Sequence, residues 1–333
     1  MHGAQEVTGS NPVAPIIFVS KARKEEKLKP QDIAGIWAPI CTPFTNEEVD
    51  LKKLEENMEI YSQTPLRGYF ALGSNGEACM LDREERIKVL KVVVKKRGKN
   101  QLVMAGCSHE SARGTIILIK EAAEEGADIV SVITPHYFKK VMTDDALIKF
   151  YERVADESPL PVMIYNAPGF AGGVQLSPKA IARLSQHPNI IGIKDSAPTG
   201  PNIFLSLVNT EEFAVLAGSA NFFITSLLMG AVGGVLSLAN FLPHACCRLY
   251  DIFRQGNMEE AGKLQRAIIR VNREVSGRYG VAGVKAAMDF AGFNGGDPRL
   301  PLLPLTQDNK EKIRLTLKRF VDEYPEFKTY LKI

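Results

Sequence analysis

The sequence predicts a parallel α/β protein, a (β/α)8 TIM barrel with a C-terminal helical extension. From residue 35 to about residue 255, short apolar runs with β-branched residues alternate with longer stretches of helical period. Eight such units follow one another with no two strands in succession, which indicates a parallel sheet, and eight units close a barrel. A doubly wound open sheet is the alternative, but no G-x-G-x-x-G motif follows the first apolar run.

The expected strands are short and mostly apolar. In chain order they cover residues 35–39, 68–73, 101–106, 129–134, 161–166, 190–194, 213–217 and 233–238. The helices between them are expected to begin near Asp50, Asp82, Ser111, Thr143, Ser177, Gly200 and Asn221, and an eighth begins at Pro243. Acidic residues around Asp82 suit the positive end of a helix dipole, and Ser177-Pro178 joins an N-cap to a proline at the first helical position.

The alternation stops after the eighth unit, so we expect three parts in the chain. Residues 1–30 form a flexible N-terminal arm, residues 31–256 form the barrel, and residues 257–333 form the helical extension. In the arm, charges follow the short apolar run at residues 16–19 rather than precede it, which argues against a signal peptide. The extension is expected to hold helices over residues 258–278, 281–290 and 308–331, which either cover the barrel or mediate assembly.

The composition is that of an ordinary globular protein, with 45% hydrophobic and 24% charged residues. The 41 basic and 38 acidic side chains leave a net charge of +3, which gives no electrostatic case for a nucleic-acid or membrane partner. The 5 cysteines are odd in number and form no C-x-x-C, and the 5 histidines are dispersed. We therefore expect a reducing compartment (the cytoplasm, with the mitochondrial matrix as the alternative), no metal site and no cofactor.

The most informative residue is Lys194, which ends the apolar strand that begins at Ile190. An unpaired ammonium is costly to bury, so a lysine at the end of a buried strand suggests a special role. The functional interpretation is a nucleophilic amine with a lowered pKa that forms a Schiff base with a carbonyl substrate. The structural alternative is a lysine whose ammonium reaches solvent at the strand end. Asp195 is expected to point the other way, because side chains alternate along a strand.

Polar residues also follow the other strands, at the end of the barrel where active sites lie. Gly-Ser-Asn-Gly-Glu occupies residues 73–77, Thr-Pro-His-Tyr occupies 134–137, Tyr-Asn-Ala-Pro occupies 165–168, and Gly218-Ser219 follows the seventh strand. The glycine-rich segment is either an ordinary turn or a nest of backbone N–H groups that holds a carboxylate. Tyr137 and Tyr165 are either catalytic or half-buried ring fillers.

Together, residues 73–77, 165–168 and 192–195 resemble the dihydrodipicolinate synthase / N-acetylneuraminate lyase family of class I aldolases. The resemblance spans roughly residues 33–305. The Ser-Asn form of the glycine loop and the stretches 216–220 and 230–235 are similar to the 4-hydroxy-2-oxoglutarate aldolases within the family. The resemblance implies an enzyme that binds pyruvate and an aldehyde and assembles as a homotetramer.

Site residues follow from the same resemblance. It implies that Lys194 forms the Schiff base, that Tyr165 relays protons through Ser74, and that Ser74 and Asn75 bind the substrate carboxylate. A second relay tyrosine, supplied by a neighbouring subunit in the family, falls on Tyr137. The substrate-binding positions at the barrel mouth are completed by Ser196, Gly218, Ser219 and Phe170.

One departure concerns the second substrate. Where dihydrodipicolinate synthases have a Ser-Arg pair whose arginine binds the carboxylate of the aldehyde, this chain has Gly169-Phe170. A phenylalanine makes no ion pair, so we expect cleavage of a 4-hydroxy-2-oxo acid, either 4-hydroxy-2-oxoglutarate or a 2-keto-3-deoxy sugar acid. The alternatives are a dihydrodipicolinate synthase, which condenses pyruvate with aspartate semialdehyde, and a barrel that binds a keto acid without turnover.

Overall fold

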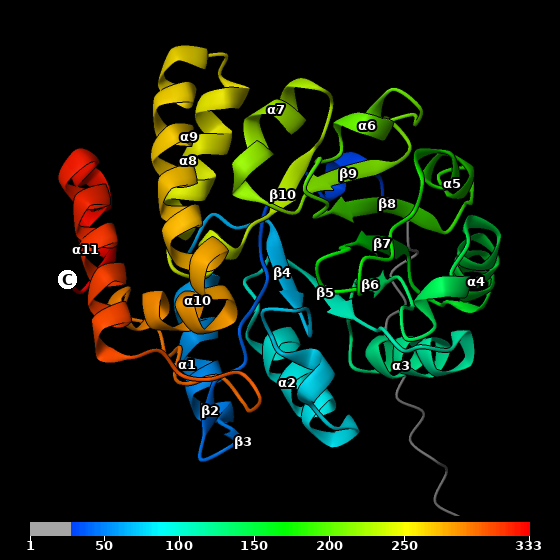
Figure 1. The fold of residues 1–333 in the computed structure, drawn as a ribbon, viewed down its shortest axis with the longest axis horizontal. Helices are drawn as coiled ribbons and strands as arrows, with labels where there is room; N and C mark the ends of the chain where they lie inside the picture. Colours follow the sequence, from blue (N-terminus) through cyan, green and yellow to red (C-terminus); the bar gives the residue numbers. More distant parts are fainter. Residues whose placement is uncertain (1–27) are drawn as a thin grey trace, which may run out of the picture.

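The computed structural model describes residues 28–333, so the predicted N-terminal arm lies outside the described residues except for its last three positions. The predicted fold class is confirmed: eight parallel strands close into a barrel in the order β1-β10-β9-β8-β7-β6-β5-β4, and helices surround it (Figure 1). A separate antiparallel pair, β2 (Phe44–Thr45) and β3 (Glu48–Val49), lies between the first barrel strand and the first helix.

The barrel strands and the helices around them agree with the expected units to within a few residues. The strands are β1 (Gly35–Ala38), β4 (Gly68–Ala71), β5 (Leu102–Gly106), β6 (Ile129–Ile133), β7 (Val162–Asn166), β8 (Ile190–Asp195), β9 (Ala214–Ala217) and β10 (Gly233–Val235). The helices that follow them are α1 (Leu51–Ser62), α2 (Arg83–Lys96), α3 (Ala112–Glu124), α4 (Asp144–Glu157), α5 (Pro178–Leu184), α6 (Asn202–Leu205), α7 (Phe223–Leu228) and α8 (Pro243–Arg254).

Helix starts carry the N-caps that the sequence suggested. The Ser177 hydroxyl accepts a hydrogen bond from the backbone N–H of Ala180 at the start of α5. At the start of α2, Asp82 and Glu85 form a reciprocal capping box. These local bonds fix where each helix leaves the loop at the mouth of the barrel.

Two layers of apolar side chains hold the barrel together. Inward-facing residues of the strands fill its interior, among them Trp37, Phe70, Met104, Met163 and Leu216. Outward-facing residues pack against the surrounding helices in a second, larger cluster. The interior is therefore a packed core and not a pore, and the open space lies at its ends.

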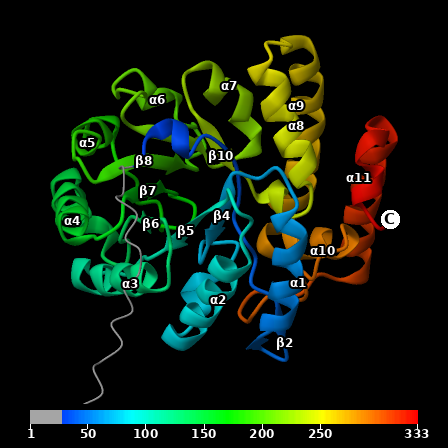
Figure 2. The ribbon, with the colours of Figure 1, turned by 180° about the vertical axis from the view of Figure 1, so that it is seen from behind.

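The extension consists of α9 (Met258–Asn272), α10 (Arg278–Phe290) and α11 (Gln307–Glu323), which lie together on one side of the barrel with α11 at the outer edge (Figures 1 and 2). A π-helical segment, Arg273–Gly277, joins α9 to α10. Inside α10, Gly280 leaves the helical conformation with φ 56° and ψ −140°. None of the helices in residues 28–333 is both long and apolar enough to cross a membrane.

The expected helix over residues 308–331 is wrong in its last third, after residue 323. Helix α11 ends at Glu323, and residues Pro325–Tyr330 form a separate 3-10 helix. The cause is Pro325, because the residue before a proline is forced out of the helical region. Tyr324 accordingly has φ −128° and ψ 76°.

Candidate active site

A cavity of about 750 Å³ opens at the carboxyl ends of β4 to β7. One wall comes from the loops that follow these strands and includes Ser74, Thr134, Tyr165 and Phe170. The opposite wall comes from the C-terminal extension: Tyr279–Ala282 of α10 and the leucines at 302, 303 and 305. The extension therefore covers one side of the barrel mouth, which was one of the two roles expected for it.

Lys194 is buried beside this cavity, with 4% of its surface exposed. Its Nζ lies 3.9 Å from the ring centroid of Tyr165 and 4.6 Å from that of Phe70, and both rings line the cavity. Lys194 forms no ion pair with any carboxylate in residues 28–333. Burial lowers the pKa of Lys194, an effect that the neighbouring Tyr165 partly opposes. A larger share of unprotonated, nucleophilic amine is thus present near neutral pH than on a free lysine.

Tyr165 joins Lys194 to the glycine loop. Its hydroxyl lies 3.3 Å from the Ser74 hydroxyl, and its ring meets Phe70 edge to face at 5.8 Å. The two hydroxyls can pass a proton between them, since each can donate or accept. The structure thus brings Lys194, Tyr165 and Ser74 together although they come from β8, β7 and the loop after β4.

The glycine loop is arranged for an anion. The backbone N–H groups of Ser74, Asn75 and Gly76 donate no hydrogen bond within the described residues, which leaves them free for a carboxylate. The Asn75 side chain is buried, its Nδ2 has no partner in the described part of the chain, and it does not line the cavity. Asn75 would therefore reach a ligand through its backbone.

Phe170 lines the cavity and is 57% exposed, whereas Tyr137 is 77% exposed and does not line it. The loop that carries Tyr137 is held by Glu110, whose Oε2 accepts hydrogen bonds from the backbone N–H groups of His136 and Tyr137, each at 2.9 Å. The Tyr137 ring packs edge to face on Phe138 and faces outward.

The remaining substrate-binding candidates lie at the ends of β8 and β9 and do not line this cavity. The Ser196 hydroxyl donates to the carbonyl of Gly218 at 3.4 Å, and the Gly218 N–H donates to the carbonyl of Asp195 at 2.7 Å. The Ser219 hydroxyl accepts from the N–H of Asn221 at 3.2 Å. All three positions are thus engaged in local hydrogen bonds.

Sequence reasoning missed the wall contributed by α10 and by the leucines, as well as Arg86, which lines the cavity from α2. Each of these residues fits the pattern of an amphipathic helix or a loop, so no local signal marked them. Residues 28–333 hold no group of three or more His, Cys, Asp or Glu side chains that could bind a metal ion.

Asn166 and Asp195 directly follow Tyr165 and Lys194 in β7 and β8, and their side chains link these two strands. The Asn166 amide donates to Asp195 Oδ1 at 2.6 Å, while Asp195 Oδ2 is buried without a partner in the described structure. As expected, Asp195 does not share the surroundings of Lys194. Burial raises the pKa of Asp195 to about 6.

This shift predicts a pH-dependent stability difference between the wild type and Asp195→Asn, which keeps the acceptor for Asn166. Below about pH 3 the aspartate is protonated in both folded and unfolded states and contributes no pH-dependent term, and from about pH 4 upward the unfolded state ionises while the folded state stays protonated. Above pH 6 the folded state carries the cost of a buried charge. The variant should therefore gain about 2–3 kcal/mol relative to the wild type between pH 4 and pH 7.5, as measured by urea unfolding. A difference that stays constant with pH would contradict the assignment.

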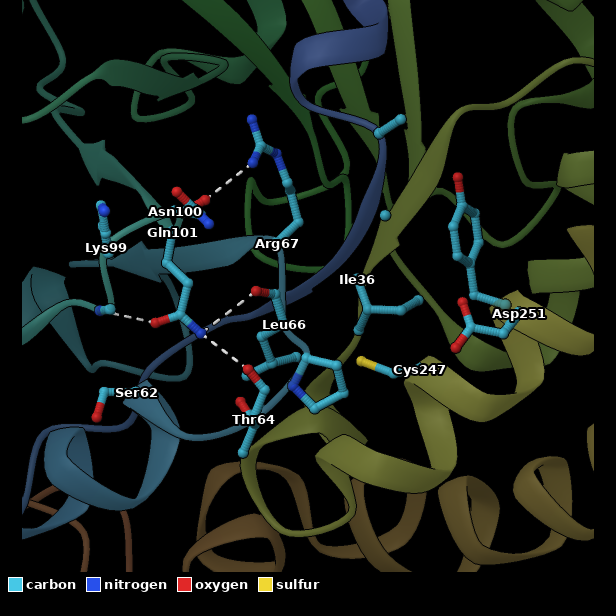
Figure 3. Close-up of a pocket in the computed structure, with 15 residues that line it drawn as sticks. Ile36, Ser62, Thr64, Leu66, Arg67, Lys99, Asn100, Gln101, Cys247 and Asp251 are labelled. Atoms are coloured by element: carbon cyan, nitrogen blue, oxygen red, sulfur yellow. Dashed lines mark hydrogen bonds between the residues drawn. The ribbon is translucent and has the colours of Figure 1, made fainter.

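A second cavity, of about 470 Å³, lies at the opposite end of the barrel (Figure 3). Its central polar side chain, Gln101, accepts from the N–H of Gly98 and donates to the carbonyls of Thr64 and Leu66. Arg67 donates to the carbonyl of Asn100 at 2.9 Å. These groups tie the strand starts together, which is the role expected of this end of a barrel.

Comparison with known proteins identifies relatives over most of the chain. The family model described as "Dihydrodipicolinate synthetase family" matches residues 32–320. The protein named "Probable 4-hydroxy-2-oxoglutarate aldolase, mitochondrial" from Emericella nidulans is 35% identical over 275 residues, 81% of this chain and 89% of that protein. The 4-hydroxy-tetrahydrodipicolinate synthase of Geobacter sulfurreducens is 34% identical over 294 residues, 86% of this chain and 98% of that protein.

Solved structures show the same architecture. The dihydrodipicolinate synthase of Acinetobacter baumannii, complexed with pyruvate, matches with a TM-score of 0.81 and 31% identity over 86% of this chain and 99% of that chain. A prophage protein of the dihydrodipicolinic acid synthase family from E. coli, also in complex with pyruvate, matches with a TM-score of 0.80 and 28% identity over 86% of this chain and 98% of that chain.

Proposed function

This chain belongs to the dihydrodipicolinate synthetase family of pyruvate-dependent class I aldolases and synthases, and from this premise we propose that it cleaves a 4-hydroxy-2-oxo acid to pyruvate and an aldehyde. The preferred substrate is 4-hydroxy-2-oxoglutarate, which yields pyruvate and glyoxylate. A 2-keto-3-deoxy sugar acid, which is also a 4-hydroxy-2-oxo acid, is the alternative substrate. The resemblance to the aldolase from Emericella nidulans supports this choice.

In the proposed reaction, the Lys194 amine attacks the C2 carbonyl and loses water to form an imine, while the loop at Ser74 holds the C1 carboxylate. Tyr165 accepts the proton of the C4 hydroxyl while its own hydroxyl proton passes on through the Ser74 hydroxyl. The C3–C4 bond breaks, glyoxylate leaves, and the electron pair of that bond moves into the imine to give an enamine. Protonation at C3 and hydrolysis then release pyruvate and restore the free lysine. The hydroxyls of Tyr165 and Ser74 lie 3.3 Å apart, within reach of a hydrogen bond, which supports this route.

Phe170 is the observation that carries the choice between cleavage and dihydrodipicolinate synthesis. It lines the cavity in the loop after β7, where the synthases have an arginine for the carboxylate of the aldehyde. The arginine that does line the cavity, Arg86, donates to the backbone carbonyls of Ala78 at 2.9 Å and Gly106 at 2.7 Å. Arg86 is thus committed to the fold and does not replace the missing guanidinium.

We therefore expect kcat/KM for 4-hydroxy-2-oxoglutarate cleavage to exceed kcat/KM for condensation with aspartate semialdehyde by at least about tenfold. Lost hydrogen bonds to a charged group cost about 1.5–3 kcal/mol each, and about 1.4 kcal/mol corresponds to a factor of ten. The measurement is pyruvate release from a panel of 4-hydroxy-2-oxo acids against consumption of pyruvate with the semialdehyde. Phe170→Arg should raise the condensation rate, and Phe170→Leu is the matched control. A higher kcat/KM for condensation in the wild type would overturn the proposal.

Two further expectations belong to this proposal. The outward position of Tyr137 supports a homo-oligomer, a tetramer by resemblance, in which this tyrosine serves the site of a neighbouring subunit.

The 5 cysteines are all free, and 4 of them are buried, which supports a reducing compartment such as the cytoplasm or the mitochondrial matrix.

A further inference from the structure

A buried ion pair lies beneath the glycine loop. Glu77, which ends the loop, and Lys285 of α10 approach to 2.5 Å between Oε1 and Nζ, and their side chains are 1% and 0% exposed. The contact is an ion pair without the alignment of a hydrogen bond. Removing two charges from water costs free energy that offsets much of the attraction between them. A buried ion pair is therefore weak evidence that the contact stabilises the fold. Its position is more informative than its energy.

Glu77 connects the loop to two separate parts of the extension. Besides Lys285, its carboxylate accepts a hydrogen bond at Oε2 from the backbone N–H of Arg299, at 2.8 Å. Lys285 in turn donates to the carbonyl of Asp297 at 3.1 Å, and both Lys285 and Arg299 lie 4.4 Å from the ring centroid of Phe44. One carboxylate thereby fixes both α10 and the linker that follows it against the loop.

The loop needs such support, because its backbone is held in an unfavourable conformation. Glu77 has φ 53° and Leu72, just before the loop, has φ 58°, both in the left-handed region that non-glycine residues rarely adopt. Gly76 is also tightly placed: its carbonyl accepts from Thr42 at 2.8 Å, and an added Cβ would lie 2.9 Å from the carbonyl oxygen of Ile40. The Glu77 side chain is thus the connection between this conformation and the extension.

We propose that Glu77 and Lys285 are positioning residues that hold the Ser74–Asn75 segment where its N–H groups receive the substrate carboxylate and where the Ser74 hydroxyl faces Tyr165. The pair acts through the loop and touches no reacting atom. This inference rests on the proposed roles of Lys194 and of the loop. It makes the C-terminal extension part of the pyruvate site, since Lys285 belongs to α10.

The test measures the pyruvate concentration that gives half-maximal borohydride trapping at Lys194. Glu77→Gln and Lys285→Met should each raise this concentration by between about tenfold and 100-fold, because a displacement of about 1 Å in a positioning group has effects of that size. Each single variant should also lower the melting temperature, since it leaves one buried charge without its partner. Turnover at saturating 4-hydroxy-2-oxoglutarate should fall by a smaller factor than the affinity for pyruvate.

The double variant Glu77→Gln/Lys285→Met separates positioning from stability. With both charges removed, the melting temperature should return toward that of the wild type, but the half-saturating concentration should stay raised.

The matched control is Asn57→Ala, which breaks the hydrogen bonds of Asn57 to the backbone of Asn294 at 2.9 and 2.7 Å and so loosens the same linker without touching the loop. This control should lower stability and leave the half-saturating concentration unchanged.

Two results would overturn the inference: a double variant whose half-saturating concentration is within about twofold of the wild type, or an Asn57→Ala variant with the same increase as the pair variants. Failure of the wild type to form any adduct with pyruvate would instead contradict the proposed function. The two failures are thus distinguished in one experiment.

Discussion

Lys194→Met is expected to abolish the borohydride adduct with pyruvate and to lower turnover by at least about 10³-fold, since loss of a covalent nucleophile removes the route itself. The reason lies in the surroundings of the lysine. Its Nζ lies against the rings of both Phe70 and Tyr165 without a carboxylate partner in the described residues, and burial lowers the pKa of Lys194. Peptide mass mapping of the wild-type adduct should place it on Lys194. An adduct on another lysine would contradict the assignment.

Loss of activity in Lys194→Met should not come from unfolding. The lowered pKa of Lys194 means that the unfolded state binds its proton more tightly, so the lysine costs stability, and the cost grows as the pH falls toward the folded-state pKa. Methionine carries no such charge and has a similar shape. The variant should therefore unfold at a temperature equal to or above that of the wild type, with a larger difference at pH 6 than at pH 9. A large loss of stability would make the activity result uninformative about catalysis, and Lys194→Arg then replaces it as the test of imine formation.

The barrel could be predicted from the sequence because its signals are local. Each strand is a short apolar run, each helix has its own period, and caps such as Ser177 and Asp82 mark the starts. Lys194 could be singled out as a candidate for a similar reason, since a cation at the end of an apolar strand conflicts with its immediate neighbours. Its role in forming a Schiff base stays a prediction. Once a barrel is inferred, the polar residues that follow its strands must share one mouth.

The rest of the site depends on partners that are distant in the chain. Glu77 was visible as part of the glycine motif, but its partner Lys285 sits in a helix whose pattern gives no reason to distinguish it from a surface lysine. The same applies to Tyr279 and Val281, which reach the cavity only because α10 packs across the barrel mouth. The helix expected through Pro325 shows the opposite error, since the amphipathic pattern continued past a proline that ends the helix.

Tyr165→Phe is expected to lower kcat by about 10²–10⁴-fold while pyruvate is still trapped on Lys194. The substitution removes only the hydroxyl that lies 3.3 Å from Ser74, and it keeps the ring that packs on Phe70 and covers Lys194. Imine formation, which needs the amine and the carboxylate loop, should therefore survive, whereas proton transfer during cleavage of the C3–C4 bond should not. Single-turnover measurements separate the two steps.

The same variant should shift the pH dependence of trapping in a defined direction. Tyr165 opposes the lowering of the Lys194 pKa, so removing its hydroxyl should lower that pKa further and move the rise in trapping rate to lower pH. Tyr250→Phe is the matched control, because it removes a hydroxyl that donates to the carbonyl of Val232 at 3.2 Å at the other end of the barrel. It should change neither kcat nor the pH profile. If Tyr165→Phe turns over at the wild-type rate, the tyrosine only fills space beside the lysine, and the proton in the cleavage step must be carried by another group.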